Sequence, residues 1–369
     1  MAAVTRSTAE CHRVGPPPGS GKNGAMDLEE LLRAAGIGED EVQAASAEGP
    51  ARLQAMIATR LALPGPRRYR AREVGRLAGV EREEADRLWL AMGFPLVPED
   101  ERAFTDADVE ALLTARDLFA RVDIDNTLAL QLTRTMSRAV AQIASAIQDV
   151  MAPLTQRDDP VETVGAAVSL VEQALPALDR LLVYLFRRHL SAAAERMVLT
   201  RLESPDQSTT IVGFADLVGY TGLSQELSEQ ELATLIDRFS ADAMDLVADS
   251  GGRVIKMIGD EIMFSAGQAV IGAEIGLRLI ERIAVVEDRP ALRVGLAGGR
   301  VLELQGDLFG ATVNLASRLV DFARPGTVVV DSAVHDALEG DERFVFKSLR
   351  PHRLKGFGTV PTYVLRGNR

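Results

Sequence analysis

One stretch, residues 209–265, limits what this chain can fold into more than any other. Runs of apolar and β-branched residues bounded by polar ones are typical of strands, whereas a helical period of apolar positions is typical of a helix. On these patterns we expect a strand over 209–215, a helix over 228–250 and two further strands over 254–258 and 261–265. A strand, a crossover helix and a hairpin in this order predict an α/β unit in which the hairpin lies beside the first strand.

Two aspartates lie at the ends of these predicted strands. Asp216 follows the first strand, and Asp260 occupies the tight turn between the other two. If the strands share a sheet, the carboxylates become neighbours, and neighbouring carboxylates repel unless a cation lies between them. Either aspartate alone could be a helix cap or a turn residue. Together, with Lys256 on the adjacent strand, they predict a site for a divalent metal ion and a nucleotide.

Three sequence blocks resemble the signature blocks of the class III adenylyl cyclases. They are residues 214–221 (FADLVGYT), 256–260 (KMIGD) and 306–318 (GDLFGATVNLASR). Three ordered blocks are far more specific than a lone glycine motif. The likeness covers about residues 205–369 and implies an α+β catalytic domain there, with a ferredoxin-like core made of a mixed sheet flanked by helices.

The resemblance implies an enzyme that converts ATP to 3′,5′-cyclic AMP and pyrophosphate, by in-line attack of the ribose 3′-hydroxyl on the α-phosphorus. It also implies two divalent cations, Mg²⁺ or Mn²⁺, with Asp216 and Asp260 as their ligands. The backbone amides from Phe214 to Gly219 are expected to cradle the phosphates, because they lie at a strand end. Lys355 resembles the late lysine of the family, which meets the β- and γ-phosphates.

Lys256 and Asp307 are expected to select the base. A lysine offers only hydrogen-bond donors and an aspartate only acceptors. The unprotonated ring N1 and the amino group of adenine fit that pair, whereas guanine would present a ring N–H and a carbonyl to the wrong partners. By resemblance these two residues specify adenine, which argues against the alternative of a guanylyl cyclase. A diguanylate cyclase is a further alternative, because residues 258–262 are similar to the hairpin of that family, but the second glycine is missing.

Asn314 and Arg318 are four residues apart in a predicted helix, so they share one face. An arginine suits bidentate stabilisation of phosphate charge, and an asparagine can orient a ribose. In the family these two residues act on the nucleotide that the partner subunit binds. This chain carries both halves of the site, so the resemblance implies a homodimer with two shared active sites.

The rest of the C-terminal half continues the alternation of helices and strands. We expect helices over 269–285, 314–322 and 334–338, and strands over 292–301, 328–330, 344–346 and 362–365.

Composition narrows the class of protein. The net charge of −12 argues against general nucleic-acid binding, which needs a basic face. Cys11 is the only cysteine, so no disulfide framework exists. There is no uncharged apolar window long enough to span a membrane, and the N-terminus has no signal-peptide core. We expect a soluble, cytoplasmic protein.

The sequence of the N-terminal half predicts an all-helical regulatory domain over 26–186, after a disordered segment over 1–25. Residues 69–121 resemble the helix-turn-helix of MerR-type regulators, with a first helix ending near Gly79 and a second ending at Gly93. The second helix is mostly acidic, which is the wrong sign for DNA phosphates. We therefore expect a module for protein contacts, with a DNA-binding regulator as the alternative.

Two more helical features complete this half. Apolar residues over 127–151 have near-heptad spacing, which suits packing on another helix, within the domain or across a dimer. Residues 187–204 predict a helical linker that ends at Pro205 and joins the two domains. His189 lies in this linker beside two arginines, and we hypothesise that its protonation makes the activity pH-sensitive.

Overall fold

The computed structural model describes residues 38–49, 56, 59, 60, 62, 63, 65–155, 160–202, 209–284, 290–354 and 356–368. The chain divides into two compact units, residues 1–187 and 188–369. The segment 1–25, for which disorder was predicted, lies outside the described residues. So do most of the helical patterns expected over 26–63.

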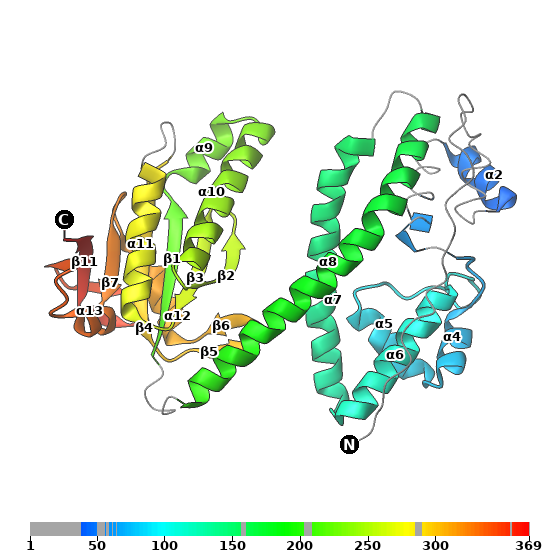
Figure 1. Cartoon of the computed structure of the whole chain (residues 1–369), viewed down its shortest axis with the longest axis horizontal. Coiled ribbons are helices and arrows are strands. Elements are labelled where there is room, and N and C mark those ends of the chain that lie inside the picture. The colour runs from blue at the N-terminus through cyan, green and yellow to red at the C-terminus, as the bar shows by residue number, and fades with distance from the viewer. Residues whose placement is uncertain are drawn as a thin grey trace, which may run out of the picture. The chain divides into compact units, whose positions relative to one another are not determined.

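The first unit is helical throughout its described secondary structure, apart from one β-bridge between Tyr69 and Phe104. Its helices are α2 (Glu39–Glu48), α4 (Ala71–Ala78), α5 (Arg82–Ala91), α6 (Asp106–Val122), α7 (Asn126–Thr155) and most of α8 (Pro160–Leu202) (Figure 1). Within residues 69–121, α4, a turn at Gly79 and α5 follow one another where the sequence predicted two helices and a turn. Gly79 ends α4 in the left-handed region at φ 65°, where glycine pays no steric penalty. The buried hydrophobic cluster of this module takes side chains from its three helices, the α4–α5 turn and the bridge, namely Val74, Ala78, Val80, Leu88, Phe104 and Leu112.

Helices α7 and α8 are long and carry exposed apolar side chains. Those on α7 follow the near-heptad positions of the sequence, among them Leu132, Met136, Val140, Ile143 and Val150. The helix expected over 187–204 is confirmed as far as Leu202, but it has no separate start. It is the last part of α8, a continuous helix of 43 residues that contains Pro176.

The second unit is built on a seven-stranded mixed sheet in the order β2-β3-β1-β4-β7-β11-β8. Its strands are β1 (Thr210–Leu217), β2 (Arg253–Ile258), β3 (Glu261–Ala266), β4 (Leu292–Gly299), β7 (Val328–Asp331), β8 (Phe344–Ser348) and β11 (Thr362–Gly367). Only β4 and β7 pair in parallel, and every other pair of neighbours is antiparallel. Two small hairpins accompany it, β5 (Leu302–Leu304) with β6 (Asp307–Phe309), and β9 (His352–Leu354) with β10 (Gly358–Val360).

Helices cover both faces of this sheet, as expected for the ferredoxin-like core. They are α9 (Tyr220–Glu226), α10 (Glu229–Asp249), α11 (Ala269–Ala284), α12 (Ala311–Phe322) and α13 (Ser332–Leu338). Helices α10, α11 and α13 pack on one face, against side chains such as Phe264 and Leu296. Helix α12 packs on the other face, against Phe214 and Met263. Because side chains alternate along a strand, Asp216, two residues after Phe214, lies on the face that α12 covers.

Gly295 sets how closely α12 approaches the sheet. A Cβ at this position would lie 2.3 Å from the backbone nitrogen of Val320 and 2.6 Å from the carbonyl oxygen of Ala316. Only a residue without a side chain lets the helix backbone lie directly on β4.

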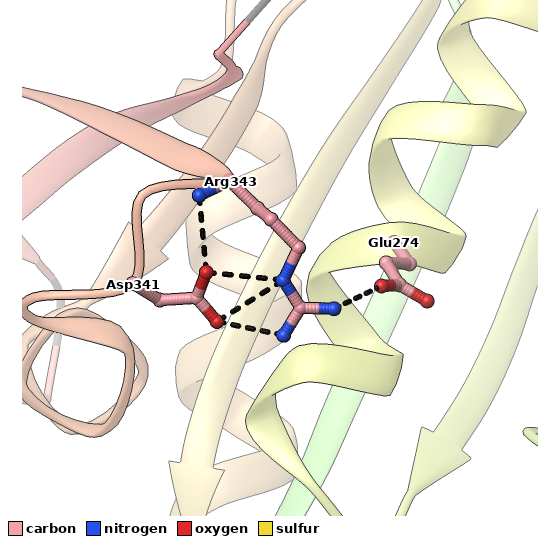
Figure 2. A network of polar contacts seen from close by, with 3 residues as sticks. All are labelled: Glu274, Asp341 and Arg343. Carbon is pink, nitrogen blue, oxygen red and sulfur yellow. Dashed lines mark hydrogen bonds and ion pairs between the residues drawn. The ribbon is translucent and has the colours of Figure 1, made fainter.

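At the far edge of the sheet, Arg343 ties the start of β8 to α11. Its guanidinium pairs with Asp341 at 2.7 Å and with Glu274 of α11 at 3.0 Å, as Figure 2 shows. This pairing holds the pKa of Asp341 below its ordinary value. Among the described residues, no helix is both long and apolar enough to cross a membrane.

Candidate active site

The β2–β3 hairpin brings the two predicted metal ligands together. Asp216, near the end of β1, lies opposite Glu261 of β3, the residue that follows Asp260. The backbone nitrogen of Leu217 donates to the carbonyl oxygen of Asp260 at 3.3 Å, which fixes the hairpin turn against the strand end. Burial, together with the negative charge of Asp216, raises the pKa of Asp260 to about 6. The two carboxylates are therefore neighbours that resist being ionised together.

Arg293 is a functional candidate that the sequence reasoning missed. It lies on β4 directly opposite Asp216, on the other side from Glu261. Its Nη2 and Nε atoms contact Oδ2 of Asp216 at 2.5 Å and 2.7 Å. The available signal was a charged residue inside an otherwise apolar strand, where burial of a charge requires a partner.

Glu261 is the second residue that was missed. It is half-buried, and burial, together with the negative charges of Asp216, Asp321 and Asp260, raises its pKa to about 7. The row Glu261, Asp216, Arg293 thus runs across three neighbouring strands on the face under α12. It holds two acids and one base, so the site carries an excess of negative charge.

A divalent cation suits this set of donors. Carboxylate oxygens are the ligands that Mg²⁺ and Mn²⁺ prefer, and a cation would relieve the repulsion that raises the pKa of Asp260. Across the part of the chain that the structure describes, no three His, Cys, Asp or Glu side chains form a ready metal cluster. The remaining ligands would therefore have to be water or phosphate oxygens, as is usual for Mg²⁺ at nucleotide sites.

Lys256 and Asp307 meet although they are far apart in the chain. Nζ of Lys256 on β2 lies 2.6 Å from Oδ2 of Asp307 on β6, and Oδ1 of Asp307 accepts from the backbone nitrogen of Leu308 at 2.8 Å. A second ion pair, Arg253 with Glu303 at 2.7 Å, also joins β2 to the β5–β6 hairpin. A cationic donor and an anionic acceptor thus lie side by side and partly exposed, 40% and 27% respectively.

Asn314 and Arg318 both lie on the exposed side of α12. The opposite side of this helix, with Ala316 and Leu319, packs on the sheet. The two residues share one face, as predicted, and that face is turned away from the sheet that carries Asp216. Nη1 of Arg318 lies 3.3 Å from Oδ2 of Asp321, one turn further along the helix.

The predicted phosphate cradle needs a correction. Phe214 is only 5% exposed, in the core under α12, and its backbone is paired with strands on both sides. The amides of Leu217 and Val218 donate to the carbonyl oxygens of Asp260 and Ala291. Of the cradle expected from Phe214 to Gly219, Gly219 remains, exposed at φ 79° and at the start of α9. Lys355 lies outside the described residues.

Comparison with known proteins gives consistent matches. The family model described as "Adenylate and Guanylate cyclase catalytic domain" matches residues 202–367. The chain is 36% identical to an adenylate cyclase of Glutamicibacter nicotianae, over 82% of this chain and 79% of that protein. It is 34% identical to an adenylate cyclase of Streptomyces coelicolor, over 94% of this chain and 95% of that one. It is 30% identical to a pH-sensitive adenylate cyclase of Mycobacterium tuberculosis, over 96% of this chain and 90% of that one.

Proposed function

The chain belongs to the adenylate and guanylate cyclase family, and from this premise we propose that it is an adenylyl cyclase that converts ATP to 3′,5′-cyclic AMP and pyrophosphate. The observation that carries the choice of ATP is the 2.6 Å pair of Lys256 and Asp307. When adenine lies beside this pair, the lysine can donate to N1 of the base and the aspartate can accept from the amino group of the base. Guanine would leave both groups facing partners of the wrong kind, which would weaken its binding.

The reaction needs the triphosphate and the ribose held in line. The 3′-hydroxyl oxygen loses its proton to solvent water and forms a bond to the α-phosphorus, the bond from that phosphorus to the bridging oxygen breaks, and pyrophosphate leaves. Asp216 and Asp260 would hold two divalent ions, Mg²⁺ or Mn²⁺, which activate the hydroxyl and neutralise the phosphates when bound. The chain's own part is positioning and charge: Asn314 orients the ribose, and Arg318 stabilises the charge that develops on the phosphate.

Cyclase domains of this family often dimerise, and we place two shared sites in a homodimer. The support is the position of Asn314 and Arg318 on the face of α12 that is turned away from its own sheet. Neither residue serves the Asp216 site of its own protomer in this arrangement. A second copy must therefore bring its helix to that site, and a monomer has no complete site.

The substrate assignment can be tested by turnover. Purified full-length protein is given equal concentrations of ATP or GTP with Mg²⁺ or Mn²⁺, and the cyclic products are separated by chromatography. We expect cyclic AMP to predominate by on the order of 100-fold. Comparable formation of cyclic GMP, or hydrolysis to a nucleoside diphosphate in place of cyclisation, would contradict the proposal.

The shared-site arrangement can be tested by mixing. We expect Asp216→Ala and Arg318→Ala to be inactive as homodimers, and to regain up to about a quarter of the wild-type activity when the two chains are mixed, because a random mixture is half heterodimer and each heterodimer has one intact site. Mixing either variant with itself is the matched control. If the mixture stays inactive although heterodimers form, the two halves of the site do not come from different chains.

We also propose that the activity depends on pH and is regulated by the helical unit. The support is the similarity over 96% of the chain to a cyclase whose name describes it as pH-sensitive. His189, the sensor proposed above, is exposed on α8. If His189→Gln leaves the pH–activity curve of the full-length protein unchanged, His189 is not the sensor.

A further inference from the structure

Arg293 makes contacts in two directions at once. Nε and Nη2 hold the Asp216 carboxylate, and Nη1 donates to the backbone carbonyl oxygen of Asp321 at 3.1 Å. Because the guanidinium is planar and its donors form a rigid fork, the position of one partner constrains that of the other. One arginine therefore joins a candidate metal ligand to α12.

The second contact caps the end of the helix. Asp321 lies in the last turn of α12, where backbone carbonyls lack partners within the helix and the helix dipole favours a cation. Arg293 can reach this carbonyl because Gly295, on the same face of β4, lets the helix lie directly on the strand. At the same turn, Arg318 pairs with the side chain of Asp321 at 3.3 Å.

We propose that Arg293 is a positioning residue that couples the two active sites of the dimer. It holds Asp216 for the site of its own protomer, and it holds the end of α12, with Arg318, for the site of the partner. This inference rests on the proposed function, because only a shared site gives the two contacts different destinations. Loss of Arg293 should then damage both sites, each in a different way.

A heterodimer with a single working site separates the two effects. One full-length chain carries Arg318→Ala and supplies Asp216, the other carries Asp216→Ala and supplies Arg318, and different affinity tags allow purification of the mixed dimer. Arg293→Met is then added to one chain or the other. In the chain that supplies Asp216, we expect a rise of roughly 10-fold or more in the Mn²⁺ concentration needed for half-maximal activity. In the chain that supplies Arg318, we expect kcat to fall roughly 10- to 100-fold with unchanged metal dependence.

Two further variants guard against a trivial loss of structure. Arg278→Met removes another ion-paired arginine of this unit, whose Nη2 lies 2.9 Å from Oδ2 of Asp249. This pair is not part of the site, so the substitution should change neither the metal dependence nor kcat. Arg293→Lys keeps the charge but cannot form the fork, so it should restore metal dependence more fully than kcat. Calorimetric titration of Mn²⁺ with an unreactive ATP analogue reports weakened metal binding in the Arg293→Met homodimer independently of turnover.

The outcomes are distinct. A loss in only one of the two placements means that Arg293 serves one site alone, and this overturns the coupling, as does the absence of loss in both. An inactive parent heterodimer points to failure of the shared-site function itself. Activity in the parent, with the expected loss in both placements, supports the coupling.

Discussion

The strand-end carboxylates of the second unit and helix α5 of the first both lie in sequence motifs of known families, but their side chains lead to different conclusions. Asp216 and Asp260 converge at one turn, and a cation would relieve their repulsion. On α5, Arg82 is bound to Glu99 at 2.5 Å and to Asp86 at 3.6 Å, and Arg87 lies 3.9 Å from Glu83. The helix-turn-helix forms, but both arginines of its second helix are paired with acids.

The two regions differ in how their charged side chains are placed. A helix that reads DNA needs cations that are available to phosphates and base edges. A cyclase site needs acids close enough to share a metal ion. The backbone geometry fits in both regions, and only the side chains decide between them. Four measurements test these differences, and they follow in order of expected effect.

The largest effect is expected at the carboxylates. Asp216→Asn or Asp260→Asn should lower kcat by on the order of 1,000-fold or more, because the amide keeps the shape but loses the charge that holds the metal. Steady-state turnover measures the loss, and thermal unfolding checks that the fold is intact. The matched control is Asp249→Asn, an exposed aspartate of α10 that pairs with Arg278. Nearly normal activity of both site variants would remove the metal site from the mechanism.

The next effect is expected at the base-selecting pair. Changing Lys256 to Glu and Asp307 to Lys reverses the sense of donor and acceptor, so the ratio of kcat/KM for ATP over GTP should fall by roughly 100-fold. Competition between the two nucleotides measures this ratio directly. Arg253→Gln with Glu303→Gln is the control, because that pair joins the same elements without facing the base in this proposal. An unchanged preference would show that other residues choose the base.

A smaller effect on metal binding is expected when the pH is lowered. Because the pKa of Asp260 is raised to about 6, its carboxyl takes up a proton as the pH falls below that value, whereas an ordinary aspartate would remain ionised. The metal concentration for half-maximal activity should therefore rise about fivefold between pH 6 and pH 5, and saturating Mn²⁺ should restore the rate. Metal titrations at several pH values test this. A flat profile would mean that Asp260 does not limit metal binding.

The smallest effect is expected at the helix-turn-helix. Full-length protein should bind duplex DNA no more tightly than a micromolar Kd at physiological salt, since the paired arginines of α5 leave few cations for phosphates. Changing Arg82 and Arg87 to Ala should then leave binding and its salt dependence unaltered. A nanomolar, strongly salt-dependent complex that these changes abolish would restore the reading of this unit as a regulator that binds DNA.

Local sequence signals predicted much of the fold and part of the site. The hairpin at Gly259 and Asp260 was predictable because a tight turn between apolar runs fixes its own geometry. Arg293 and Glu261 were missed because their proximity to Asp216 depends on strand register, which alternation of side chains alone does not give. The contact of Arg293 with Asp321 is made to a backbone carbonyl oxygen, so no pattern of side chains could predict it.

Two other differences between the sequence predictions and the structure also have physical causes. The backbone amides from Phe214 to Gly219 were expected to cradle phosphates because they lie at a strand end, but Phe214 lies inside the sheet and pairs with strands on both sides. The helical linker over 187–204 forms as far as Leu202, but its continuity with the preceding helix through Pro176 was not predicted. A long helix tolerates one proline where the loss of a single hydrogen bond is outweighed by the remaining turns.

Gly295 has a consequence that reaches beyond its own subunit. A methyl group there would collide with the backbone of Val320 and lift α12 off the strand. In a dimer with shared sites, that helix completes the active site of the partner subunit. A Gly295→Ala subunit would thus displace the helix that completes the active site of its partner, so an altered copy would lower the activity of normal copies in a mixed population.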